Sequence, residues 1–106
     1  MGRSSSQTGA SLEYLAAFRQ ALRITAEDFD GEITDLIRAA RRELTLGGVL
    51  SRRAADEADP LVKRAVMSYV KAEFGLDNED ADKYRAAYGR LKVALAMATD
   101  YLGGEG

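Results

Sequence analysis

Carboxylates occur in two dense groups that have the right chemistry to bind a cation or to transfer a proton. The first, residues 28–32, is similar to the middle of a calcium-binding EF-hand loop. Aligning Gly31 with the invariant glycine of such a loop places Ala26 at the first ligand position and Ile37 where a bidentate Glu is required. Because both anchoring ligands are missing, we expect no bound metal and three solvent-facing acids at a helix start: Asp28, Asp30 and Glu32.

The second group, Asp77–Asp82, holds four carboxylates in six residues. A pair of catalytic carboxylates needs an enclosed pocket and shifted pKa values, whereas an N-cap and a helix dipole account for the same acids at a helix start. The chain also has no His and no Cys, so it lacks the commonest general base, the best nucleophile and the commonest metal ligands. We expect no catalytic residue, no cofactor and no enzymatic activity.

Basic residues gather in the middle of the chain and leave two interpretations open. They either face DNA or an acidic neighbour, or they form a solvated surface that complements helix dipoles. The formal net charge of −2 argues against tight phosphate binding. We expect weak, sequence-independent DNA contact at most, through six residues: Arg38, Arg42, Arg52, Arg53, Lys63 and Arg64.

Hydrophobic periodicity places these groups on an all-α fold, a small four-helix bundle with helices at about 12–23, 26–46, 60–74 and 79–101. Ser11 is a predicted N-cap, Thr25 and Asp28 approximate a capping box, and Asp59 precedes a proline at the first helical position. Residues 49–59 are expected to be a loop. The expected core comprises Phe18, Leu22, Phe29, Ile33, Leu36, Ile37, Val66, Tyr69, Val70, Tyr84, Leu91 and Leu95.

The last predicted helix is apolar on two sides. Leu91 and Leu95 share one side, while Val93 and Met97 lie nearly opposite. Either the helix is sandwiched inside the monomer, or the second side contacts another subunit. For the second case we expect head-to-tail contacts through Val93, Met97, Ala86 and Met67, with acids Asp77, Asp80 and Asp82 near a neighbour's Arg38, Arg42 or Arg52.

The expected domain organisation is a flexible leader at 1–11, one helical domain at 12–102 and a flexible tail at 103–106. The leader has no apolar signal-peptide region. No apolar run approaches the length of a membrane span, so we expect no membrane association.

Three segments carry a family resemblance. The stretch Asp59–Gly75, which runs directly into Leu76–Tyr84, resembles the third helix of the head–tail connector (adaptor) proteins of tailed bacteriophages. The most specific part of the match is Tyr69-Val-Lys-Ala-Glu-Phe-Gly-Leu-Asp-Asn78. The segment Tyr88–Leu95 is similar to the final helix of that family, and Ile33–Ala40 leading to Gly47-Gly48-Val49 is also similar. The resemblance covers about residues 12–102.

The resemblance implies a structural subunit of the virion neck, with no catalytic residues. It implies a homo-oligomeric ring on the portal protein. The free chain can remain a monomer until the portal acts as a template for assembly. Such a ring extends the channel for double-stranded DNA and joins the head to the next neck or tail-completion protein. It implies a protein made and assembled in the bacterial host cytoplasm. The alternative from another class is a small helical DNA-binding regulator, although no helix starts with the side-by-side Arg, Asn or Gln typical of a recognition helix.

Overall fold

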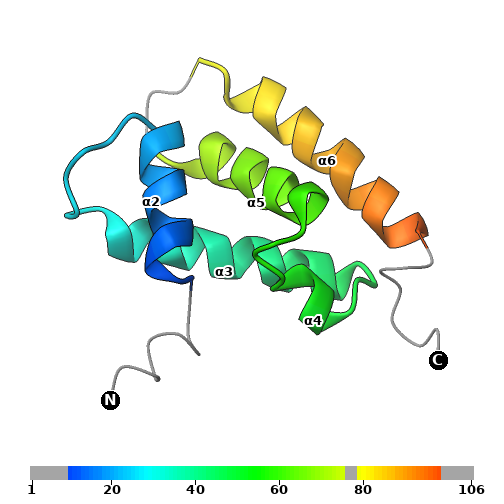
Figure 1. Cartoon of the computed structure of the whole chain (residues 1–106). Helices are drawn as coiled ribbons and strands as arrows, with labels where there is room; N and C mark the ends of the chain where they lie inside the picture. The colour runs from blue at the N-terminus through cyan, green and yellow to red at the C-terminus, as the bar shows by residue number, and fades with distance from the viewer. Residues whose placement is uncertain (1–9, 76–78, 99–106) are drawn as a thin grey trace.

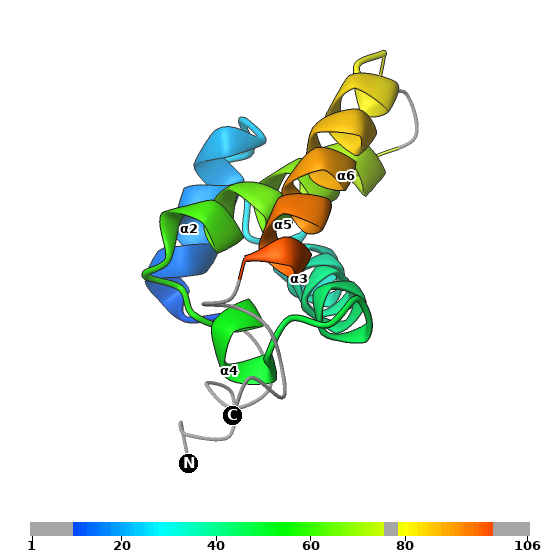
Figure 2. The ribbon, with the colours of Figure 1, turned by 90° about the vertical axis from the view of Figure 1, so that its right-hand side faces the viewer.

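A computed structural model describes residues 10–75 and 79–98. Within these residues the chain forms five helical segments, and the all-α class is confirmed. Figure 1 shows them in order: α2 (Leu12–Ala21), α3 (Asp30–Leu46), α4 (Ser51–Ala54), α5 (Pro60–Glu73) and α6 (Ala81–Met97). Helix α5 lies at the centre, between α3 on one side and α6 on the other, and α2 crosses the bundle beside the first half of α3 (Figures 1 and 2).

Helix α2 begins as expected and ends earlier than expected. The Ser11 hydroxyl accepts a hydrogen bond from the Tyr14 amide at 3.2 Å, which confirms the predicted N-cap. The helix stops at Ala21, not at Arg23, because Arg23 adopts a left-handed conformation with φ 61°. The amides of Arg23 and Ile24 then bond the carbonyls of Gln20 and Arg19, which is the hydrogen-bond pattern of a Schellman motif.

Helix α3 starts at Asp30, four residues later than the predicted residue 26. The expected capping box does not form: the N-cap is Phe29, without a side-chain cap bond, and Thr25 and Asp28 are exposed. The end at Leu46 is as predicted, and Gly48 follows with φ 112°, a conformation that glycine adopts at little cost.

The segment expected to be a loop contains a short helix. Helix α4 forms one turn because the amides of Ala54 and Ala55 reach the carbonyls of Leu50 and Ser51 at 2.9 and 3.1 Å. Its register buries Ala54 in the core next to Val49. The small side chain allows this close approach, and single-turn pieces of this kind carry no strong periodic signal.

Helix α5 has the predicted start. The Asp59 side chain accepts hydrogen bonds from the amides of Leu61 and Val62, and Pro60 occupies the first helical position. The predicted 79–101 helix is shorter than expected: α6 begins at Ala81, and Ala98 leaves the helix with an extended backbone. Its expected residues 99–101 lie outside the described part of the chain.

The core is continuous across α2, α3, α5 and α6. Phe18, Ile33, Ile37, Val66, Val70 and Leu95 are buried as predicted. Phe29 is wrong as a core residue: it is 44% exposed, because it lies at the N-cap of α3, before the buried stripe of that helix begins. Its ring meets Phe74 edge-on at 5.6 Å. A further five predicted core residues lie at the periphery and are half-buried: Leu22, Leu36, Tyr69, Tyr84 and Leu91.

Candidate interaction surfaces

The outward side of α6 carries exposed apolar side chains, with the exposed Arg90 among them. Val93 is 57% exposed and Met97 is 74% exposed, and Ala86 is exposed on the same side. Leu95 of the same helix is 1% exposed and packs in the core. The monomer therefore uses one side of α6, and the outward strip, defined as Ala86, Val93 and Met97, has no cover from the described residues. Met67, which was grouped with these residues, instead packs half-buried against the core.

Other exposed apolar side chains lie at helix ends. Leu12 begins α2, Leu46 ends α3 and Leu61 is in the first turn of α5, and each is exposed. Periodicity did not single out Leu12 and Leu46, because a terminal residue belongs to no sustained stripe. A sequence signal for Leu46 was nevertheless present, since it stands directly before the Gly47-Gly48 stop and off the phase of Ala40 and Leu44.

The predicted basic surface divides into two groups. Arg38, Arg42, Arg52 and Arg64 are exposed on α3, α4 and α5. Arg53 and Lys63 are half-buried, and the Lys63 ammonium lies 5.9 Å from the centre of the Tyr14 ring. Lys63 thus lies over an aromatic face of α2. The exposed group is the part that a partner or DNA can reach.

The two acidic groups have distinct surroundings. Asp30 was expected to face solvent, but it is half-buried. Both of its carboxylate oxygens lie 2.8 Å from Arg19 Nη1, and this ion pair joins α2 to the start of α3. Asp28 and Glu32 are exposed as expected. No three carboxylates in the described residues gather in a geometry that can hold a metal ion.

Of the acids at the start of α6, Asp80 and Asp82 are exposed. Asp82 pairs with Arg85 at 3.2 Å, one turn further along the helix. Asp77 lies outside the described residues. The structure places Asp80 and Asp82 at the opposite end of α6 from Met97.

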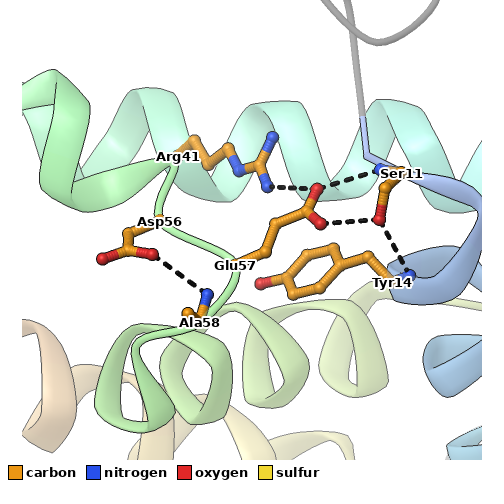
Figure 3. Close-up of polar contacts among 6 residues, drawn as sticks. All are labelled: Ser11, Tyr14, Arg41, Asp56, Glu57 and Ala58. Atoms are coloured by element: carbon orange, nitrogen blue, oxygen red, sulfur yellow. Dashed lines mark hydrogen bonds and ion pairs between the residues drawn. The ribbon is translucent and has the colours of Figure 1, made fainter.

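A polar cluster anchors the linker between α4 and α5 to the rest of the fold (Figure 3). The Glu57 carboxylate accepts hydrogen bonds from the Ser11 amide at 2.9 Å and from the Ser11 hydroxyl at 2.6 Å, and it lies 3.7 Å from Arg41 Nη2. The Arg41 guanidinium also lies 5.4 Å from the centre of the Tyr14 ring. One carboxylate therefore joins the start of α2, the middle of α3 and the linker. Sequence reasoning missed this cluster because its members are up to 46 residues apart.

A depression of about 260 Å³ opens between α3, α5 and α6. We call it the glutamate–tyrosine cleft; its lining residues are Glu43, Tyr69, Ala72, Glu73, Arg85 and Tyr88. The Tyr88 hydroxyl donates a hydrogen bond to Glu43 at 3.0 Å, and the Tyr69 and Tyr88 rings meet edge-on at 5.2 Å. Burial raises the pKa of Tyr88, and the hydrogen bond to Glu43 raises it further. Tyr69 was predicted as a core residue, but no local signal placed it beside Tyr88 and the two glutamates.

Comparison with known proteins defines the class of this chain. The family model described as "Phage connector protein" matches residues 15–102, so the chain belongs to the head–tail connector family of bacteriophages. Searches of curated proteins and of solved structures found no significant match. Membership makes the chain a structural component of the virion that associates with phage portal and tail proteins. None of the helices in the described residues has the length and apolar character to cross a bilayer.

Proposed function

We propose that this chain is the subunit of a homo-oligomeric ring in the phage neck. The ring sits on the portal, continues the DNA channel and provides the attachment surface for the next neck or tail-completion protein. Assembly takes place in the cytoplasm of the bacterial host. The proposal rests on the family match together with one observation, the outward strip of α6, where Val93 and Met97 are exposed on a helix whose other side is already in the core.

A ring requires that one surface of each subunit contact a different surface of the next. The outward strip supplies one such surface, and the exposed Arg38, Arg42 and Arg52 lie on other helices and supply charge for a second. A net charge of −2 suits a conduit that must let DNA slide through. The same charge, with the family match, favours the connector over a DNA-binding regulator.

The test is reconstitution on the portal. The purified chain is mixed with the portal ring encoded by the same phage, and the mixture is examined by native mass spectrometry and negative-stain electron microscopy. We expect an added ring of density on one face of the portal, with a fixed number of copies. A chain that stays unbound at micromolar concentration contradicts the proposal. A gel shift that persists at about 200 mM salt favours the regulator, because non-specific phosphate contacts weaken steeply with salt.

A further inference from the structure

The side chains around the glutamate–tyrosine cleft carry a net negative charge. Glu43, Glu73 and the adjacent Asp82 carry three negative charges around it, against the positive charges of Arg85 and Lys92. Arg85 Nε lies 3.2 Å from Glu73, and Lys92 Nζ lies 3.9 Å from Glu43. Both cationic side chains are more than one third exposed, so these pairs are weak and solvent-screened. Burial raises the pKa of Tyr69, and the charges of Glu43 and Glu73 raise it further.

The lining suits a guanidinium group. Carboxylates bind arginine through paired, charge-assisted hydrogen bonds. Aromatic rings attract the flat face of the same cation. The cleft offers both features on facing helices, with Glu43 on α3, Glu73 and Tyr69 on α5, and Tyr88 on α6. An ammonium group would use the carboxylates but would gain less from the planar rings.

The chain carries matching arginines on a separate surface. Arg38 and Arg42 are exposed on α3 one helical turn apart, and neither has an ion-pair partner in the described part of the chain. At 100° per residue, Arg38 lies about 140° around α3 from Glu43. Arg42 lies about 100° around α3 from Glu43. Both arginines are therefore on a different side of α3 from the cleft of their own chain, where another copy can reach them.

The cleft also borders the outward strip of α6. Val93 lies about 80° around the helix from Arg85, which lines the cleft. One neighbour can therefore cover the apolar strip and the cleft together. Since the arginine pair and the cleft are different surfaces, their contact is head-to-tail, the type that closes rings.

We propose that the glutamate–tyrosine cleft receives Arg42, with Arg38 beside it, from the neighbouring copy of this chain. This inference rests on the proposed function, because it assigns residues to the contact between ring subunits. It replaces the acidic turn as the main acceptor of the neighbour's arginines, since the pocket beside Asp80 is already lined by two cations of the same chain, Arg23 and Lys71.

The test is a charge swap within one chain. Arg42→Glu and Glu73→Arg each place like charges across the contact and should weaken ring assembly on the portal by at least about tenfold. The double variant Arg42→Glu/Glu73→Arg restores an opposite-charge pair at every contact and should recover assembly. Arg23→Glu is the matched control, because it makes the same change of charge at an exposed arginine that belongs to none of the proposed contact surfaces and should assemble normally. Circular dichroism checks that each variant is folded.

Cross-linking provides a second measurement that does not depend on charge reversal. The chain has no cysteine, so Arg42→Cys/Glu73→Cys introduces the only two thiols. A short bismaleimide applied to portal-bound rings should produce a ladder of covalent oligomers, and Arg64→Cys/Glu73→Cys should not.

The outcomes separate the inference from the proposed function. The cleft assignment is overturned if the wild type forms rings and neither single variant weakens assembly. It is also overturned if the double variant does not recover assembly. In both cases the proposed ring stands. If Glu73→Arg loses portal binding and Arg42→Glu does not, the cleft binds a basic residue of the portal. This result also overturns the cleft assignment. Failure of the wild-type chain to form any ring overturns the proposed function and, with it, the cleft contact.

Discussion

Replacing Val93 by aspartate distinguishes the proposed interface from the monomer core on a single helix. Val93 is 57% exposed, and a substitution at such a position changes the free energy of unfolding by within about 0.5 kcal/mol. The variant should therefore remain folded and helical as a free chain. Leu95→Asp is the matched control, because Leu95 is 1% exposed and an unpaired carboxylate in the core should unfold the chain.

The effect of Val93→Asp on ring assembly follows from the apolar area of the outward strip that is exposed to water in the monomer. Fully burying a Val or Met side chain contributes about 1.5–3 kcal/mol. With 57% and 74% of Val93 and Met97 exposed, covering both contributes about 2–4 kcal/mol per contact. That corresponds to about 30- to 1000-fold in affinity. A buried carboxylate loses part of this contribution and adds its own desolvation cost, so Val93→Asp should abolish ring formation at micromolar concentration.

The assay compares the variants by circular dichroism, urea denaturation and portal-bound ring formation in the electron microscope. Wild-type stability with no rings is the expected result for Val93→Asp. Two results contradict the reasoning. If Val93→Asp unfolds, the outward strip belongs to the monomer's own core. If it forms rings as well as the wild type, the subunit contact lies elsewhere, and the exposed Leu12, Leu46 and Leu61 become the next positions to test.

The remaining predictions concern the monomer and DNA. Ile37→Ala should lower the free energy of unfolding by about 2–5 kcal/mol in urea, and Leu36→Ala clearly less, because Ile37 is fully buried and Leu36 is half-exposed; equal losses would contradict the burial pattern. Arg23→Gly should stabilise the chain by about 0.5–1 kcal/mol, since glycine adopts φ 61° without strain. The pKa of Tyr88 is raised in the folded chain. Its contribution to the free energy of unfolding is therefore complete below pH 10 and falls above pH 10 by at most about 1.4 kcal/mol per pH unit; Tyr88→Phe should remove part of this loss of stability at alkaline pH. Arg52→Glu should weaken DNA binding equally for all sequences in a filter assay and reduce its salt dependence.

Much of the fold was predictable because its signals are local. The Asp59-Pro60 start and the Gly47-Gly48 stop are encoded in neighbouring residues, and the structure places both as expected. The errors arose where tertiary contacts or rare backbone geometry decide the outcome. An arginine in the left-handed region ends α2, although sequence preference assigns that position to glycine.

The candidate surfaces were predictable only in part, for a similar reason. The outward strip followed from helical phase alone, which is why Val93 and Met97 could be named from the sequence. The glutamate–tyrosine cleft could not, since Glu43 and Tyr88 are 45 residues apart and meet only because α5 brings α3 and α6 together. A phase analysis treats Glu43 as one more charged residue beside the apolar stripe of α3.

The distribution of exposed apolar residues bears on the kind of assembly. A two-fold dimer needs one self-complementary patch, whereas a ring subunit in a neck meets neighbours on both sides, the portal at one end and another protein at the other. The outward strip lies on α6, while Leu12 and Leu61 lie at the starts of α2 and α5. A single patch on α6 does not explain exposed leucines on two other helices. Several separate contacts explain these exposed leucines, and a connector subunit requires several separate contacts.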